Sequence, residues 1–265
     1  MALRSANVTV MVQAAQKAAR HLVRDFGEVE NLQVSLKGPG DFVSAADRRA
    51  EQILRQELSK ARPGFGLLLE ESGEVVGRDQ GYRWIVDPLD GTTNFLHGLP
   101  HFSISIALER RGELVAGVIY DPIKDELFAA EKGAGAYLND RRIRVSRRSD
   151  LANCLIGTGI PVLDWPGRDK GFALQLERVS DHVAGIRRIG TASLDLAYVA
   201  AGRLDGFWEY GLKPWDIAAG IVLVREAGGL VSRAEGDDDL LEPGTVVASN
   251  ATVHGKLAEL LRINL

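Results

Sequence analysis

The segment from Tyr82 to Phe95 constrains the fold more than any other part of the chain. It reads Tyr-Arg-Trp-Ile-Val-Asp-Pro-Leu-Asp-Gly-Thr-Thr-Asn-Phe. The apolar run before Asp87 predicts a buried strand, and Pro88 is expected to break the hydrogen-bond ladder of that strand. Gly91 and the two threonines after it predict the start of a helix. The segment therefore predicts a strand that ends in two acids and leads directly into a helix.

The two acids of this segment point to a metal. Asp87 and Asp90 lie at the mouth of the predicted strand, where their repulsion requires protons or cations to offset it. Hard oxygen ligands at this density favour Mg²⁺, and the carbonyl of Leu89 could supply another oxygen. Free N–H groups at the predicted helix start, beside Gly91, favour a bound phosphate. Phosphoryl hydrolysis needs this combination; the alternative is a simple turn that terminates a strand.

Two further acidic positions follow predicted elements. Glu70 and Glu71 end a short apolar run at residues 66–69, and Asp216 follows Pro214 at a predicted helix start. Taken alone, each has a simpler explanation. The glutamates could be exposed acids at a strand end, and the aspartate could be an acid that interacts favourably with the helix dipole.

Helical and strand patterns mix in both halves of the chain. We expect a polar loop at 37–41, helices over 11–26, 44–62, 170–184, 192–201, 217–227 and at the C-terminus, and strands over 66–69, 82–86, 103–108, 114–120, 127–130, 136–138, 155–158, 186–189, 205–210, 230–232 and 246–249. This mixture predicts layered sheets and helices. We expect one domain over residues 1–265, with an α+β lobe at about 1–145 and an α/β lobe at about 146–265.

Composition calls for neither a nucleic acid nor a membrane as partner. The chain has 36 acidic and 32 basic residues, a formal charge of −4, and no apolar run near the ~20 residues that span a bilayer. Cys154 is the only cysteine, which excludes an internal disulfide and fits a reducing compartment. The N-terminus has no cleavable apolar stretch. A cytoplasmic location is therefore expected.

Together these segments resemble the inositol monophosphatase family. Glu-Glu-Ser at 70–72, the string at 84–95 and Trp-Asp-Ile-Ala-Ala-Gly at 215–220 occur in the family's order and at similar separations. The resemblance extends from the first helix to the C-terminus. It implies a layered αβαβα sandwich of the inositol monophosphatase and fructose-1,6-bisphosphatase type, usually a homodimer. It also implies a Mg²⁺-dependent, lithium-sensitive phosphatase that hydrolyses a small polyol phosphate such as inositol monophosphate.

The resemblance implies two to three Mg²⁺ ions per site. The first would bind Glu70, Asp87 and the Leu89 carbonyl. The second would bind Asp87, Asp90 and Asp216. A third, weaker ion would bind Glu70 and water.

The resemblance also assigns the catalytic and loop residues. Thr92 would help Glu70 activate the attacking water, and the N–H groups of Gly91 and Thr92 would hold the phosphate. Lys37 matches a lysine on the family's mobile active-site loop, and Asp47 matches a nearby acid, with Glu71 beside them. A solvated loop charge and a helix cap remain the alternatives for Lys37 and Asp47.

On the substrate side, Glu209 matches the family's ligand for a sugar hydroxyl. The segment Gly-Thr-Ala-Ser at 190–193, which includes Ala192, matches the part that borders the sugar. For Glu209 alone, the alternative is an acid on an edge strand. Leu69 and Lys213 depart from residues that are common in the family; neither removes a ligand, but Lys213 could alter substrate preference.

Several activities share such a metal cluster, because the cluster contacts only the phosphate. Fructose-1,6-bisphosphatase, histidinol phosphatase and 3′-phosphoadenosine 5′-phosphate phosphatase activities are the alternatives, and Glu209 favours a polyol. A hypothesis of another class is a binding role, since some bacterial relatives act with the transcription machinery in antitermination. The basic stretch at 141–148 could dock RNA or such a partner, or could be a strand edge whose charges discourage pairing.

Overall fold

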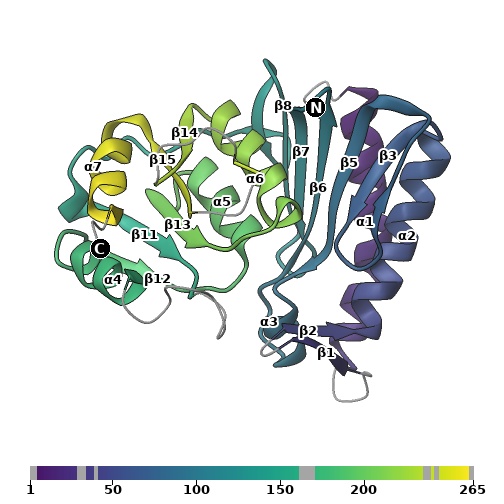
Figure 1. The fold of residues 1–265 in the computed structure, drawn as a ribbon, viewed down its shortest axis with the longest axis horizontal. Helices are drawn as coiled ribbons and strands as arrows, with labels where there is room; N and C mark the ends of the chain where they lie inside the picture. The colour runs from purple at the N-terminus through teal and green to yellow at the C-terminus, as the bar shows by residue number, and fades with distance from the viewer. Residues whose placement is uncertain are drawn as a thin grey trace.

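The computed structural model describes residues 5–28, 34–38, 41–160, 171–234, 240–241 and 245–262, with the backbone alone at 34–38 and 41–44. Helices and sheets alternate in five layers, in the order α, β, α, β, α (Figure 1). The layered αβαβα fold expected from the sequence is confirmed. Not one helix within the described residues is long and apolar enough to cross a membrane.

The first two layers are a helix pair and a large sheet. The helices are α1 (Ala6–Phe26) and α2 (Ala45–Ala61). The eight-stranded sheet has the order β10-β9-β8-β7-β6-β5-β3-β4 and comprises β3 (Phe65–Leu69), β4 (Gly73–Val75), β5 (Asp79–Asp90), β6 (Ser103–Arg110), β7 (Glu113–Asp121), β8 (Glu126–Glu131), β9 (Gly135–Leu138) and β10 (Arg141–Arg142). Trp84 and Val86 of β5 pack toward α1 and α2, and Ile85 packs toward the opposite face, as side-chain alternation along a strand requires.

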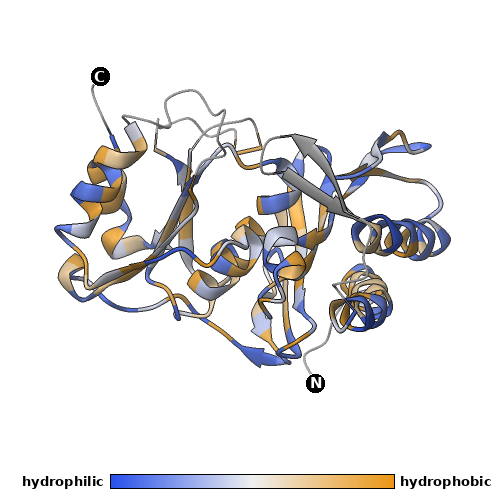
Figure 2. Ribbon diagram, turned by 90° about the horizontal axis from the view of Figure 1, so that it is seen from below, coloured by the Kyte–Doolittle hydropathy of each residue, from blue (hydrophilic) through white to orange (hydrophobic). Residues whose placement is uncertain are grey.

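The middle layer consists of two helices that are apolar almost all round. They are α5 (Ala192–Ala200) and α6 (Pro214–Glu226). A helix of this kind must be covered on every side, and here a sheet covers each face (Figure 1). Figure 2 shows the same apolar colouring on the strands that face these helices.

The last two layers belong to the second half of the chain. A five-stranded sheet has the order β12-β11-β13-β15-β14 and comprises β11 (Leu155–Thr158), β12 (Gly185–Arg187), β13 (Gly206–Tyr210), β14 (Gly229–Arg233) and β15 (Thr245–Asn250). The short 3₁₀ helix η2 (Leu151–Asn153) precedes this sheet. The helices α4 (Ala173–Ser180) and α7 (Ala251–Leu261) cover its outer face.

Three local expectations differ from the structure. The polar loop expected at 37–41 lies in a hairpin of β1 (Val34–Gly38) and β2 (Asp41–Ser44), with residues 39–40 outside the described residues. The helix expected at 170–184 is shorter, as α4, and residue 170 is not described. The ladder between β5 and β6 breaks at Pro88, as expected, but pairing resumes at Asp90 opposite Ser103. A bulge therefore carries the strand past the proline, which lacks an N–H to donate.

Candidate active site

Glu70 and Asp87 are neighbours because β3 and β5 are parallel. Leu69 pairs with Val86, so the residues that follow each strand meet at the same edge of the sheet. The N–H of Glu70 donates to the Val86 carbonyl at 3.3 Å. Asp87 is only 2% exposed, and burial, followed by the charges of Glu70 and Asp90, raises its pKa well above the usual range.

Asp90 follows the bulge and faces the second half of the chain. Its Oδ2 accepts a hydrogen bond of 2.7 Å from the Ser193 N–H, at the start of α5. Burial raises the pKa of Asp90 to about 6, against the lowering effect of the hydrogen bonds from Ser193. Gly91 comes next with φ +94°, and a Cβ there would lie 2.5 Å from Thr191 Oγ1. Only glycine fits at this position, both for conformation and for space.

Asp216 lies in the first turn of α6 and accepts a 2.7 Å hydrogen bond from the Lys213 N–H. The Trp215 carbonyl accepts from Ser105 Oγ of β6 at 3.2 Å, which holds the helix start against the large sheet. Burial and the charge of Asp90 raise the pKa of Asp216 well above its usual range. Asp216, at a helix start in the second half of the chain, therefore lies close enough to Asp90 of the first half for their charges to interact.

The donor set suits a hard divalent cation. Asp87, Asp90 and Asp216 each accept a backbone N–H on one carboxylate oxygen. Neighbouring carboxylates raise the pKa values of all three, and the charge of Lys213 lowers that of Asp216. Among the described residues, no three His, Cys, Asp or Glu side chains already stand at the spacing of metal ligands. Like charges without a cation between them repel, and a divalent cation would offset the repulsion that raises the pKa of Asp87.

Thr92 links the start of α3 (Thr92–Leu96) to a buried acid. Its Oγ1 lies 2.9 Å from Asp47 Oδ1 and 3.0 Å from the Leu89 carbonyl, so these two acceptors compete for one hydroxyl proton. Asp47 lies in the first turn of α2 and is fully buried. The hydroxyl oxygen of Thr92 retains lone pairs that can accept from a water molecule.

Glu209 lies at the end of β13 against the end of β11. A Cβ on Gly159 would lie 1.8 Å from the Glu209 carboxyl group, so the absence of a side chain there makes room for it. Burial, then Asp195 and Asp216, raise the pKa of Glu209 well above its usual range. Ala192, at the start of α5, is buried and its backbone N–H also approaches Asp90.

Glu71 and Lys37 are the remaining residues expected near the active-site loop. The N–H of Glu71 donates to Glu51 Oε2 of α2 at 2.7 Å, which holds the backbone after β3. Lys37 lies in β1, but its side chain falls outside the described residues.

Sequence reasoning assigned no individual role to four buried polar residues around these acids: Asn94, Thr191, Ser193 and Asp195, each at most 5% exposed. Both carboxylate oxygens of Asp195 are buried without a hydrogen-bond partner among the described residues. The sequence could have indicated Asp195, because an acid between Leu194 and Leu196 in an otherwise apolar helix is unusual. The other three side chains bond to segments far away in the sequence, so no local pattern reveals them.

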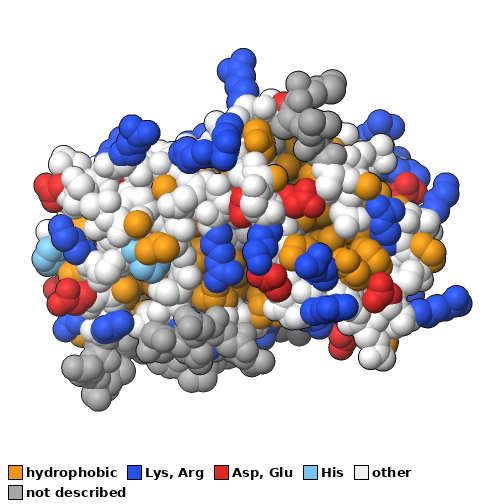
Figure 3. All heavy atoms as spheres, turned by 90° about the horizontal axis from the view of Figure 1, so that it is seen from above, with side chains coloured by type: hydrophobic (Ala, Val, Ile, Leu, Met, Phe, Trp, Pro, Cys, Tyr) orange, Lys and Arg blue, Asp and Glu red, His pale blue; other side chains and the backbone are white. Residues whose placement is uncertain are grey.

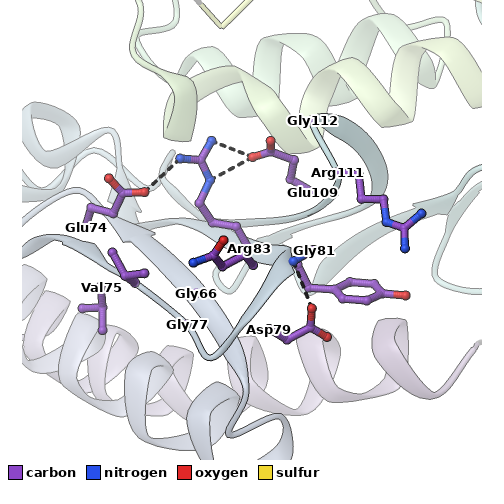
Figure 4. A pocket seen from close by; sticks show the side chains of 13 residues that line it. Gly66, Glu74, Val75, Gly77, Asp79, Gly81, Arg83, Glu109, Arg111 and Gly112 are labelled. Carbon is purple, nitrogen blue, oxygen red and sulfur yellow. Dashed lines mark hydrogen bonds and ion pairs between the residues drawn. The ribbon is translucent and has the colours of Figure 1, made fainter.

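A separate pocket of about 300 Å³ lies at the opposite end of β5. Arg83 forms its wall and bridges Glu74 and Glu109 (Figure 4). Nearby, Asp79 Oδ1 accepts from the Gly81 N–H at 2.9 Å. Arg83, Glu74 and Glu109 of this wall are thus paired with one another.

Comparison with known proteins identifies relatives over nearly the whole chain. Residues 4–265 match the model of the inositol monophosphatase family. An inositol-1-monophosphatase from Mesorhizobium japonicum is 60% identical over 259 residues, which cover 98% of this chain and 97% of that protein. A Nus factor SuhB from Pseudomonas aeruginosa is 46% identical over 246 residues, which cover 92% of this chain and 91% of that protein.

The fold has solved counterparts. The extragenic suppressor protein suhB from Bartonella henselae has a TM-score of 0.95 and 59% identity, covering 98% of this chain and 100% of that one. The similarity to phosphatases and to Nus factors therefore extends over the same residues.

Proposed function

The chain belongs to the inositol monophosphatase family and is a phosphatase, and from this premise we propose that it hydrolyses inositol monophosphate or a similar small polyol phosphate with Mg²⁺. One observation supports the proposal above all others. Asp87, Asp90 and Asp216 come from two elements far apart in the sequence, yet the charges of Asp90 and Asp216 raise the pKa of Asp87, and that of Asp90 raises the pKa of Asp216. Charges that repel in this way favour a bound cation.

We assign the metal ligands as Glu70, Asp87, Asp90 and Asp216, with the Leu89 carbonyl. When bound, Mg²⁺ would make water more acidic and stabilise negative charge on the leaving oxygen. The Leu89 carbonyl also faces Thr92 Oγ1 at 3.0 Å.

The protein's own groups would position the attacking water. With its hydroxyl proton directed to Asp47, the nearer of its two acceptors, Thr92 would accept a hydrogen bond from one water proton. Glu70 would take the other proton as the water oxygen bonds to phosphorus. The bond from phosphorus to the alcohol oxygen breaks, and that oxygen would take up a proton equivalent to the one that Glu70 removed from water, so that Glu70 is ionised again at the end of the cycle. The backbone N–H groups of Gly91 and Thr92 would hold the phosphate at the helix start.

The alcohol would bind toward the second half of the chain. Glu209 would accept a hydroxyl of the polyol, and Ala192 would border the ring. Histidinol phosphate, fructose 1,6-bisphosphate and 3′-phosphoadenosine 5′-phosphate remain alternative substrates, since the acids around Asp90 would contact only the phosphate.

The test is a panel of these substrates measured over a Mg²⁺ titration after removal of divalent cations with a chelator. We expect no turnover in chelator and full recovery with Mg²⁺.

Calcium should inhibit, because its looser coordination misplaces the water. Lithium should inhibit relative to matched sodium. Turnover in excess chelator would overturn the metal mechanism, and a strong preference for another panel member would replace inositol phosphate as the substrate.

A second candidate function is association with RNA or the transcription machinery. It is supported by the Nus factor names of relatives and by the exposed side chains of Arg141, Arg142 and Arg144. Arg141 and Arg142 form β10, the edge of the large sheet, where charge also prevents unwanted pairing. On the face seen in Figure 3, basic side chains are spread among acidic ones and do not form one continuous patch.

RNA retention measured against salt concentration would decide this second role. Phosphate contacts predict a steep loss of affinity with salt, and replacement of Arg141 and Arg142 by glutamine should remove it while turnover remains. Retention that is absent at low salt would exclude direct RNA binding. Light scattering of the same samples tests the homodimer that we also propose.

A further inference from the structure

We infer that Asn94 and Thr191 are positioning residues that fix the phosphate side of the active site against its alcohol side. The inference rests on the proposed polyol phosphatase activity. It concerns the buried hydrogen bonds between residues 91–101 and residues 189–193. We call this group of hydrogen bonds the inter-helix latch.

Asn94 forms the centre of the latch. It lies in α3, is 5% exposed, and its Nδ2 donates to the carbonyls of His101 and Ile189, each at 2.9 Å. The second of these carbonyls is 95 residues further along the chain. Thr191 Oγ1 lies 3.3 Å from the same nitrogen. The side-chain NH₂ group has two hydrogens, so one bonds within the segment of Asn94, to His101, and the other reaches the segment of Ile189 and Thr191.

Thr191 forms the opposite side of the latch and departs from the usual behaviour of a helix cap. It is the N-cap of α5, but its side chain accepts no N–H from that helix, although a threonine at this position commonly does. Its Oγ1 donates to the His101 carbonyl at 3.1 Å instead. The Ser193 N–H of the same helix start donates to Asp90 Oδ2. The start of α5 is therefore capped by the phosphate side of the site.

Gly91 packs closely against Thr191, so the phosphate side and the alcohol side of the site are in direct contact here. A Cβ on Gly91 would lie 2.5 Å from Thr191 Oγ1 and 3.1 Å from the His101 carbonyl oxygen. The backbone that would hold the phosphate thus touches the cap of the helix that begins with Ala192. A shift of Thr191 toward Gly91 would displace that backbone, and a shift away would break the hydrogen bonds to His101 and Asn94. The latch therefore sets the separation between the phosphate and alcohol sites.

The consequence concerns substrates that span both sides. A polyol phosphate needs its phosphate at Gly91 and its hydroxyl at Glu209 at the same time. A flat aryl ester such as p-nitrophenyl phosphate makes no hydroxyl contact and depends mainly on the phosphate side. Loosening the latch should therefore reduce turnover of the polyol ester more than turnover of the aryl ester.

The test compares Thr191→Val, which keeps the shape and removes the hydroxyl, with Thr191→Ser, which keeps the hydroxyl. For Val we expect kcat/KM for inositol phosphate to fall roughly three- to tenfold, the range of one lost hydrogen bond, and kcat/KM for p-nitrophenyl phosphate to change less than about twofold. Ser should restore the parent ratio. If the Val variant does not fold, Thr191→Ala removes the same hydroxyl and is interpreted in the same way.

The control is Ser249→Ala. It removes another buried hydroxyl, bonded to His254 Nδ1 at 2.9 Å, at the end of β15 that pairs with Gly206. We expect it to lower the melting temperature and to leave the substrate ratio unchanged. Equal losses on both substrates for Thr191→Val, or a Ser variant no better than Val, would overturn the inference.

Hydrogen exchange separates this inference from the proposed function, because it needs no turnover. In Thr191→Val, we expect faster exchange at both the Ser193 N–H and the Phe95 N–H, which donates to the Gly91 carbonyl. Faster exchange at Ser193 alone would show that Thr191 stabilises only its own helix. A parent protein without Mg²⁺-dependent turnover would instead overturn the proposed function, and the exchange result would still decide whether the latch exists.

Discussion

At the scale of single residues, Asp216 combines two roles that the sequence offered as alternatives. Its Oδ2 accepts the Lys213 N–H, as a helix-start acid should. Its charge also interacts with Asp90 and Glu70, which lie in the first half of the chain. One carboxylate oxygen holds the helix start while the charge belongs to the acidic site.

Replacing Asp216 with asparagine separates these roles. The amide oxygen can still accept from Lys213, so thermal unfolding should change little. The loss of one charge from the proposed metal site should slow turnover by at least ~4 kcal/mol of barrier, about a thousandfold. Calorimetry should show weaker Mg²⁺ binding. A variant within tenfold of the parent rate, with unchanged Mg²⁺ binding, would exclude Asp216 from the metal site.

Glu209 allows a second test at this scale, because it lies on the alcohol side. Glu209→Ala should lower kcat/KM for inositol phosphate by one to two decades, the effect of losing a hydrogen bond worth roughly 1.5–3 kcal/mol. p-Nitrophenyl phosphate, which offers no hydroxyl, should be less affected. Equal losses on both substrates would mean that Glu209 shapes the site generally and does not recognise the polyol.

At the scale of elements, β5 carries different chemistry at its two ends. Asp87 and Asp90 lie at the carboxyl end, beside the bulge at Pro88. Arg83, near the other end, holds Glu109 of β6 through two nitrogens and Glu74 through a third. The paired charges of the pocket in Figure 4 therefore stabilise the sheet edge at a distance from the active site.

Arg83→Met should test this division. The substitution leaves Glu109, which is 13% exposed, without its partner, and should lower the free energy of unfolding by about 1–3 kcal/mol. kcat/KM should remain within twofold of the parent. Arg111→Met is the matched control, since Arg111 lines the same pocket outside this ion-pair network, and urea unfolding should detect little change. Lost turnover at unchanged stability would mean that the pocket influences catalysis.

At the scale of the whole molecule, the acidic site opposes folding when it is fully ionised. Burial raises the pKa values of Asp87, Asp195, Glu209 and Asp216 well above their usual range, and that of Asp90 to about 6. A carboxyl group whose pKa is raised in the folded state binds its proton more tightly there than in the unfolded chain, so protonation stabilises the fold. This contribution to the free energy of unfolding is fully present below the unfolded-state pKa of about 4. It is lost as pH rises through the pKa of the folded state.

The melting temperature should therefore depend on pH and metal together. In chelator, we expect it to fall between pH 5 and pH 8. Mg²⁺ at saturating concentration should offset the fall, because it binds the ionised carboxylates of the folded state only. The stabilisation by Mg²⁺ should thus be larger at pH 8 than at pH 5. An equal shift at both pH values would mean that these carboxylates do not bind the metal.

The sequence by itself determined the elements that carry the acids. The apolar runs before Glu70 and Asp87, and the proline before Asp216, predict two strands and a helix start that the structure has, although β5 continues through its bulge to Asp90. The mixture of helical and strand patterns likewise predicts the layered fold. Each of these features depends on neighbours within a few residues, so a local pattern is enough to specify it.

Only the tertiary structure decided which of these residues meet. Asp47 is buried against Thr92, Asp195 lies among other acids, and Asn94 joins α3 to the segment before α5. These contacts connect stretches of chain about 45 to 100 residues apart. Their energies arise from burial and from hydrogen bonds that form only after the layers pack, so no local pattern encodes them.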